Sequence, residues 1–272
     1  MIEVIVSHVE EIDPASFRGE RRRVSRMREL FDHSRRIVNA LEGFRLYRRG
    51  WLRPWATYCL SPILSRFAGE TVARFDAFNA RLGECDLYTF ANVFADYPID
   101  ELLAALREVN LVVDLGANVG AFSFLIQRLC RKLRCQRRII ALEPDATNIA
   151  FLREQPFADA LEIHQAAVSS REGTARLVAG ENSVTHYVDL SPNADGLPIR
   201  TLSLASLCDE PALVKMDIEG EELNILEQGL AENVRHLVLE WHHPGAPVDF
   251  VPGNWKRIAT DIHGASTWYF RR

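Results

Sequence analysis

The sequence contains no long hydrophobic run and no recognisable export signal. Its 272 residues hold no apolar stretch of the roughly 18 residues that a membrane-spanning helix needs. The N-terminal stretch MIEVIVSHVEEIDP carries acidic side chains where an export signal needs basic ones. We therefore expect no transmembrane segment and a cytoplasmic protein.

Cysteine is scarce, and its spacing excludes the common zinc motifs. The five cysteines form no C-x-x-C pair. Cys130 and Cys135 are closest in sequence, but no second pair completes a set of four metal ligands. We expect reduced thiols and no metal site built on cysteine.

Lysine is absent from residues 18–53, where twelve arginines face only four acidic residues. The segment therefore carries a net charge of +8, and since the whole chain carries −5, the remainder carries −13. Such a segment can contact an anionic substrate, an acidic partner protein, a membrane surface or nucleic acid. The alternative, which we favour, is a solvated face of helices docked on an acidic body. We expect no nucleic-acid partner, and a homodimer stays open.

The pattern of apolar residues differs between the first hundred residues and the rest of the chain. Residues 17–46 and 54–82 repeat apolar side chains at helical intervals, and residues 100–108 are typical of a short helix. The sequence shows no internal repeat and no low-complexity linker. We therefore expect a helical N-terminal cap over residues 1–100, packed on a main domain over residues 101–272.

In the main domain, short apolar runs alternate with helical stretches. This alternation predicts an α/β fold with a doubly wound parallel sheet, whose ligand site lies beyond the carboxyl ends of the strands. Residues 172–204 carry turn residues and predict inserted β structure. The predicted buried strands are 111–116, 138–144, 161–168, 213–220 and 234–241, with 267–272 as a final edge strand; the helices are 121–133, 145–155 and 221–228.

A glycine turn follows the first predicted strand. Asp114 ends that strand, and Gly116 and Gly120 lie in the turn before a helix. Glycine has no Cβ, so the backbone there can approach a ligand closely. A dinucleotide site would favour G-x-G-x-x-G with a diphosphate on the helix N-terminus, and a carboxylate would repel that diphosphate. S-adenosylmethionine carries an ammonium and a sulfonium, so we expect Asp114 to attract this ligand.

The second strand ends in an acidic side chain. Glu143 can accept hydrogen bonds from both hydroxyls of a ribose. Pro144 then ends the strand, and Asp145 is typical of a helix N-cap. We place the ribose of the donor beside Glu143 and Pro144.

Four acidic residues follow the fourth strand: Asp217, Glu219, Glu221 and Glu222. Such a cluster at the end of a buried strand is costly unless a ligand or hydrogen bonds answer it. If the strand runs that far, Asp217 and Glu219 face the same way. We expect Asp217 beside the methyl donor or acceptor, and Glu221 and Glu222 at a helix N-terminus.

The fifth strand ends in Glu240, Trp241, His242 and His243. Histidine acts as a base near neutral pH and also ligates metals. We expect His242 to take the proton of a hydroxyl acceptor, with His243 and Asp217 as further catalytic candidates and no metal. The alternative is a metal held by Asp217, Glu240 and a histidine, which would lower the pKa of that hydroxyl.

These motifs, in this order and spacing, resemble the FkbM family of S-adenosylmethionine-dependent methyltransferases. The resemblance covers about residues 86–243, and it implies a class I methyltransferase fold, a Rossmann-like doubly wound sheet with an N-terminal helical segment. It also implies O-methylation of a small-molecule acceptor, a sugar or natural product. The segments that carry it are VVDLGANVGAFS, IIALEPDATNIAFL, AAVS at 166–169, VKMDIEGEE and LVLEWH, with CDLYTFANVFADY as a lead-in.

The resemblance further implies which residues bind S-adenosylmethionine. They are Asp114, Gly116, Ala117, Asn118 and Gly120 for the methionine part, Glu143 for the ribose, and Ala166, Ala167 and Asp217 at the pocket border.

Two other functions stay open: a non-catalytic cofactor-binding partner protein acting through residues 18–53, and an NAD-dependent oxidoreductase. An acidic cavity wall would favour a cationic acceptor, and aromatic or hydroxyl-bearing walls a sugar or polyketide.

Overall fold

A computed structural model describes residues 52–68, 71–178, 187–189, 195–260 and 267–272. The arginine-rich segment and most of the expected cap lie outside these residues, apart from Arg53 and the elements given below. Within the described part of the chain, no helix is long and apolar enough to span a membrane.

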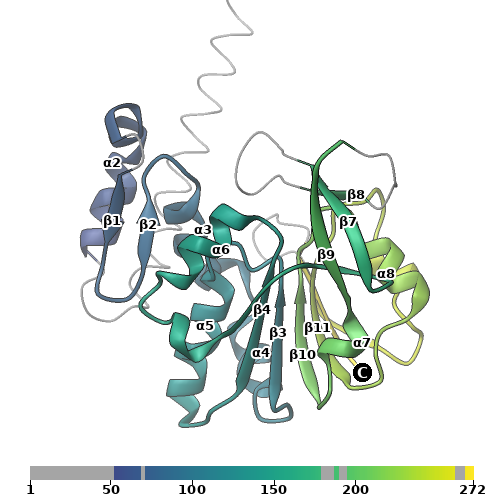
Figure 1. Cartoon of the computed structure of the whole chain (residues 1–272). Helices are drawn as coiled ribbons and strands as arrows, with labels where there is room; N and C mark the ends of the chain where they lie inside the picture. The colour runs from purple at the N-terminus through teal and green to yellow at the C-terminus, as the bar shows by residue number, and fades with distance from the viewer. Residues whose placement is uncertain (1–51, 69–70, 179–186, 190–194, 261–266) are drawn as a thin grey trace, which may run out of the picture.

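A seven-stranded sheet forms the centre of the molecule (Figure 1), in the order β12-β13-β11-β10-β3-β4-β5. β13 runs antiparallel to both of its neighbours, and the other strands share one direction. The α/β, doubly wound prediction is confirmed, but β13 is not the edge strand, because β12 lies outside it. The strands are β3 (Leu111–Leu115), β4 (Arg138–Glu143), β5 (Glu162–Gln165), β10 (Ala212–Met216), β11 (Val234–Glu240), β12 (Lys256–Thr260) and β13 (Thr267–Arg271).

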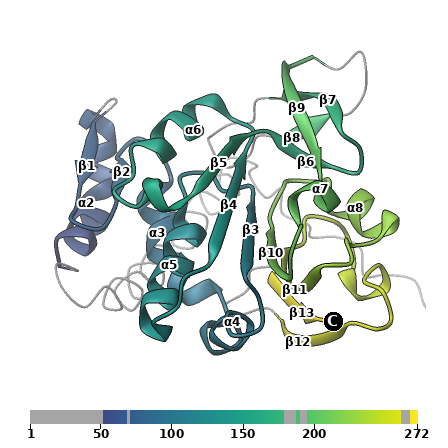
Figure 2. The same cartoon turned by 60° about the horizontal axis from the view of Figure 1, so that its bottom comes forward.

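Helices cover both faces of the sheet, which explains why its strands are continuous apolar runs. Val112 of β3 packs with Phe90 and Phe124 on one face, whereas Val113 packs with Leu226 on the other. Figure 2 shows α3 and α5 on the first face and α8 on the second. The helices are α3 (Asp86–Asp96), α4 (Ile99–Ala105), α5 (Ala121–Leu133), α6 (Ala146–Arg153), α7 (Leu204–Leu207) and α8 (Glu222–Gln228).

The helix predicted over residues 54–82 is only partly present. Helix α2 covers Leu52–Ala68, and then β1 (Val72–Arg74) and β2 (Asn79–Arg81) form an antiparallel hairpin. Asn79 exchanges hydrogen bonds with Gln155, whose side chain accepts from its backbone N–H at 2.9 Å and donates to its carbonyl at 3.1 Å. Helical periodicity in the sequence carries no information on these long-range contacts. The expected domain boundary at residue 100 falls inside α4.

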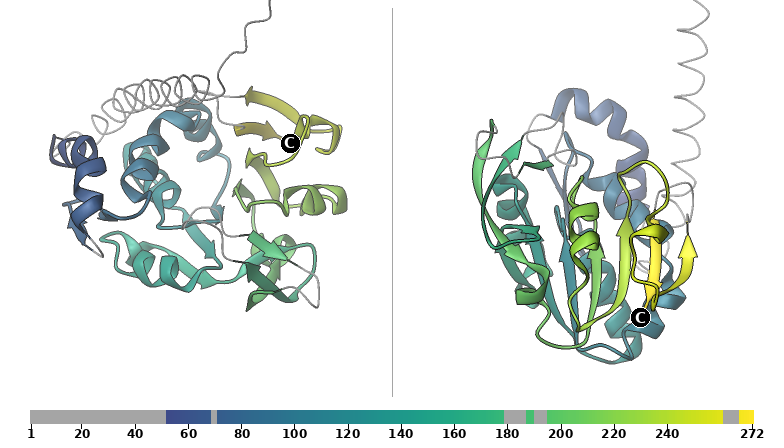
Figure 3. Two further views of the ribbon diagram at one scale, coloured as in Figure 1. Left: turned by 90° about the horizontal axis from the view of Figure 1, so that it is seen from above. Right: turned by 90° about the vertical axis from the view of Figure 1, so that its right-hand side faces the viewer.

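The predicted β insertion is confirmed as a second, four-stranded sheet. The strand predicted over residues 161–168 breaks at Ala166, so that β5 stays in the central sheet and β6 enters the second one. Figure 3 shows the two sheets as separate units. The second sheet contains β6 (Ala167–Ser169), β9 (Leu197–Ser203), β7 (Gly173–Val178) and β8 (Tyr187–Asp189), in that order.

Candidate active site

A cavity of about 420 Å³ lies beyond the carboxyl ends of β3, β4 and β10. β3 and β10 are neighbours in the sheet although about a hundred residues separate them in sequence, so they mark the point where the strand order reverses. Ligands of doubly wound sheets bind at this point. The predicted donor residues that line the cavity are Gly116, Ala117, Asn118, Glu143, Pro144, Ala166, Ala167 and Asp217.

The glycine turn is shaped by packing as well as by access to the cavity. Gly116 has a φ of +72°, and a Cβ there would lie 1.8 Å from the carbonyl oxygen of Asp217. Gly120 does not line the cavity; its φ is +87°, and a Cβ there would lie 2.5 Å from Leu152 of α6. The expectation that Gly120 makes room for a ligand is therefore corrected: it makes room for α6.

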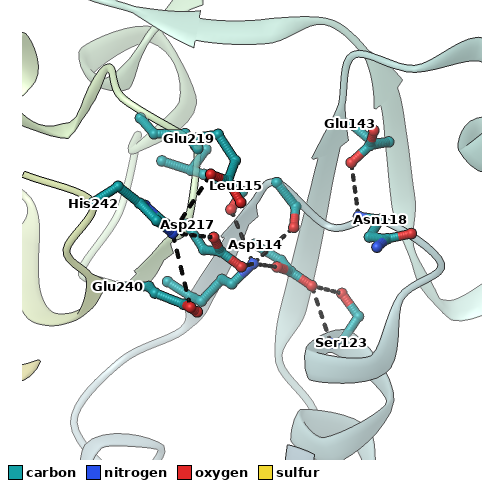
Figure 4. A network of polar contacts seen from close by, with 12 residues as sticks. Asp114, Leu115, Asn118, Ser123, Glu143, Asp217, Glu219, Glu240 and His242 are labelled. Carbon is teal, nitrogen blue, oxygen red and sulfur yellow. Dashed lines mark hydrogen bonds and ion pairs between the residues drawn. The ribbon is translucent and has the colours of Figure 1, made fainter. Parts of the chain in front are cut away.

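Asp114 lies behind the cavity wall. Its carboxylate is fully buried and accepts hydrogen bonds from the Ser123 hydroxyl at 2.7 Å and backbone N–H at 3.1 Å (Figure 4). Its second oxygen is 3.6 Å from the Lys215 ammonium. The expectation that this charge meets a cationic ligand directly does not fit the geometry, because the ammonium of Lys215 is its counter-charge inside the protein.

Lys215 connects the glycine turn to the end of β10. Its Nζ donates to the carbonyl oxygens of Gly116 at 2.7 Å and Leu115 at 3.2 Å, and lies 3.2 Å from an Asp217 oxygen. Burial alone would lower the pKa of Lys215, but the carboxylates of Asp217 and Asp114 outweigh burial and raise it. Lys215 is therefore a permanent buried cation, and the sequence analysis gave it no role.

Glu143 presents a carboxylate to the cavity and is held in place by the protein. It accepts hydrogen bonds from the backbone N–H groups of Asn118 at 2.8 Å and Asp145 at 3.1 Å, and from the Asn148 amide at 3.3 Å. Burial raises the pKa of Glu143 to about 7. The Asn118 side-chain oxygen is buried without a hydrogen-bond partner among the described residues. The cavity thus offers acceptors that suit the hydroxyl and ammonium donors of S-adenosylmethionine.

Three carboxylates of the two acidic motifs meet at the cavity. β10 ends at Met216, so the predicted strand alternation does not apply, and Glu219 has a left-handed φ of +52°. Asp217, Glu219 and Glu240 nevertheless all line the cavity. The Nε2 atom of His242 lies 3.7–3.8 Å from one oxygen of each (Figure 4).

Glu222 holds the two histidines. Its carboxylate is fully buried and lies 2.8 Å from Nδ1 of His242 and 3.1 Å from Nε2 of His243. It also accepts hydrogen bonds from the backbone N–H groups of Ile218 and Gly220. Glu222 therefore fixes the loop after β10 and orients both histidines, and neither histidine lines the cavity.

The protonation of this cluster differs from our expectation. Burial alone would lower the pKa of His242, but the hydrogen bond to Glu222 and the charges of Asp217 and Glu219 raise it to about 9. His242 is therefore protonated at neutral pH and a poor proton acceptor. Repulsion from Asp217, together with burial, raises the pKa of Glu240. Within the cluster around His242, Glu240 is the carboxylate best matched to proton transfer near neutral pH.

The alternative metal set is also assembled. Ligand atoms of Asp217, Glu240 and His242 lie within 4.8 Å of one another. However, Asp217 already faces the ammonium of Lys215, and His242 must lose a proton before it can bind a metal. Both features favour proton transfer over metal binding at this cluster.

One wall of the cavity was missed by the sequence analysis. It comes from α3 and the residues that flank it, and the Tyr97 ring packs on Phe122 of α5 with 4.9 Å between centroids. Apart from the adjacent Tyr88 and Thr89, these residues recur every three or four positions along one face of a helix, and this spacing is the signal that could have found them. The residues of this wall are Cys85, Tyr88, Thr89, Val93 and Tyr97.

A family model described as the methyltransferase FkbM domain matches residues 114–256, more than half of the chain. No curated protein matches the sequence. Among solved structures, methyltransferase FkbM from Methylobacillus flagellatus KT is 16% identical with a TM-score of 0.42, covering 79% of this chain and 59% of that protein's length. The putative methyltransferase yhhF from Escherichia coli is 14% identical, with a TM-score of 0.36 and coverages of 65% and 88%. Podospora anserina methyltransferase PaMTH1, bound to S-adenosylhomocysteine, is 12% identical, with a TM-score of 0.33 and coverages of 98% and 99%.

Proposed function

Because this chain belongs to the FkbM family of S-adenosylmethionine-dependent methyltransferases, we propose that it methylates a hydroxyl oxygen of a small acceptor, a sugar or natural product. The observation that carries this proposal is that one cavity contains both the glycine turn and a carboxylate, Glu240, with a raised pKa. A hydroxyl acceptor needs such a base near the methyl donor.

The donor would be held by the turn and by the end of β4. Ala117 and Asn118 would contact its methionine part, Glu143 its ribose, and Ala166 and Ala167 would border it. When bound, the donor supplies an electrophilic methyl carbon on a sulfonium. Asp114 and Gly120 would act indirectly, by fixing the turn and the start of α5.

The protein contributes orientation and a proton acceptor. The acceptor oxygen forms a bond to the methyl carbon while the carbon–sulfur bond breaks, and the electron pair of the broken bond stays on sulfur. The hydroxyl proton passes to Glu240. Asp217 and His242 would be positioning residues, because Asp217 is tied to Lys215 and His242 to Glu222. Holding both reactants in attack geometry supplies much of the rate.

The two other functions now stand differently. The match to a methyltransferase family overturns the NAD-dependent oxidoreductase alternative. A non-catalytic partner protein would act through residues 18–53, of which the structure describes only Leu52 and Arg53, and it has no need for a proton acceptor in the cavity.

The test uses S-adenosylmethionine with a radioactive methyl group and a panel of sugars and hydroxylated natural products. Glu240→Gln should bind S-adenosylhomocysteine like wild type and lose roughly 10²- to 10⁴-fold in turnover. Glu227→Gln, at an exposed site on α8, is the matched control. Donor binding without turnover on any acceptor would favour the partner protein, and a Glu240→Gln variant within a few-fold of wild type would reject Glu240 as the base.

A further inference from the structure

The charges that line the cavity are unbalanced. Among the described lining residues, four are carboxylates (Glu143, Asp217, Glu219 and Glu240), and Lys215 is the one lysine or arginine. With all four carboxylates ionised, which for Glu143 and Glu240 requires a pH above about 7, the formal charge of the wall is −3. The donor carries an ammonium, a sulfonium and a carboxylate, a net charge of +1, so a deficit of two positive charges remains once it is bound.

The nearby protein cations are already engaged. The Lys215 ammonium donates to two backbone carbonyls and faces Asp114 and Asp217. His242 is hydrogen-bonded to Glu222, and its Nε2 stays 3.7 Å from Glu219 and 3.8 Å from Glu240, beyond hydrogen-bond distance. Both carboxylates therefore lie near a positive charge but accept no hydrogen bond from His242, and each can accept one from a cationic ligand in the cavity.

Aromatic rings share the cavity with these carboxylates. Tyr88 lines it from α3, Tyr97 from the end of that helix, and Phe122 from α5. Aromatic faces attract ammonium groups and also pack against the apolar faces of sugar rings. A wall of carboxylates and aromatic rings is the chemistry that recognises a cation on a ring-shaped, hydroxyl-bearing molecule.

We propose that the methyl acceptor is a hydroxyl-bearing amine, such as an amino sugar or aminocyclitol, whose ammonium is held by Glu219. This inference rests on the proposed function and specifies its substrate class. The carboxylates keep the amine protonated, so its nitrogen has no free electron pair. The neighbouring hydroxyl is then the nucleophile, and its proton goes to Glu240.

The experiment compares each amine with its N-acetylated form, in which the positive charge is removed and a small acetyl group is added. Calorimetry on the full chain, saturated with S-adenosylhomocysteine, measures binding of glucosamine, galactosamine and 2-deoxystreptamine, each against its N-acetylated form. At least one amine should bind about tenfold or more tightly than its acetylated partner. Failure of S-adenosylhomocysteine itself to bind would instead count against the proposed function. No preference for the amine in any pair, including no binding in all of them, overturns the cationic acceptor.

Two further measurements keep the result specific to this wall. Glu219→Gln should remove most of the amine preference, whereas Glu227→Gln should retain it. The titrations are repeated with EDTA and with MnCl₂. A preference that survives EDTA supports the proposal. Binding of one Mn²⁺ that excludes the amine would show that the carboxylates serve a metal, and would overturn it.

Discussion

The ammonium of Lys215 donates a 2.7 Å hydrogen bond to the carbonyl oxygen of Gly116, across 99 positions of sequence. This contact joins the glycine turn to the acidic end of β10, and the same ammonium faces Asp114 and Asp217. The two halves of the cavity are therefore held together by one buried charge.

Replacing Lys215 by methionine should destabilise the protein strongly, because Asp114 is fully buried and would lose its counter-charge. Removing one partner of a buried ion pair costs about 3–5 kcal/mol. Denaturant unfolding of the full chain measures this, with Lys132→Met at an exposed site of α5 as the control. Equal stabilities of the two variants would contradict the structural role of Lys215.

The His242→Gln substitution should shift the low-pH limb of the profile of kcat/KM against pH to higher pH. The positive charge of His242 lowers the pKa of Glu240, so its removal lets that pKa rise. A base acts only when deprotonated, so activity would begin to fall at a higher pH as the solution is acidified. The measurement is kcat/KM against pH for wild type, His242→Gln and His164→Gln, a histidine on β5 at a distance from this cluster. An unchanged limb in His242→Gln would reject the coupling.

Much of the fold could be predicted because burial on both faces leaves a direct trace in the sequence. The continuous apolar runs located the five parallel strands β3, β4, β5, β10 and β11. The β1–β2 hairpin could not be found in this way, because its position depends on hydrogen bonds between Asn79 and Gln155. β12 was missed since its pairing with β13 is equally remote from local pattern.

The residues of the site could be predicted from the sequence, whereas their individual roles and protonation states could not. Strand ends meet at one sheet edge, so Glu143, Asp217 and Glu240 could be placed together. The protonation states depend on the three-dimensional contacts: the hydrogen bond that His242 donates to Glu222 keeps His242 charged, and Lys215 neutralises Asp114. Sequence spacing carries no information on either pairing.

Donor binding should weaken as the pH falls below about 7, because burial raises the pKa of Glu143 to about 7. A carboxylate with a raised pKa is ionised only above it, and the ionised form has more lone pairs for ribose hydroxyls. Calorimetric affinity for S-adenosylhomocysteine between pH 5.5 and 8.5, values chosen to span about one and a half units on each side, measures this. Glu143→Gln should bind more weakly and lose that pH dependence, while Glu154→Gln, exposed after α6, should keep it.

Chelators should leave methyl transfer unchanged if Glu240 acts as the base. Asp217 already has a counter-charge in Lys215, and His242 carries its own proton. Activity is measured after dialysis against EDTA and again after adding Mg²⁺, Mn²⁺ or Zn²⁺. Restoration by one of these ions alone would assign Asp217, Glu240 and His242 to a metal site.

Gly116→Ala should disrupt the donor turn much more than Gly245→Ala. Both glycines have a left-handed φ, +72° and +82°, so each alanine pays a similar backbone strain. Only at Gly116 would the new Cβ meet another atom, the carbonyl oxygen of Asp217 at 1.8 Å, whereas nothing lies within 4 Å at Gly245. The overpacking should cost roughly 1–3 kcal/mol beyond the control in denaturant unfolding. Because the clash pushes the turn away from β10, affinity for S-adenosylhomocysteine should fall as well; equal losses in both variants would mean that the turn does not depend on this contact.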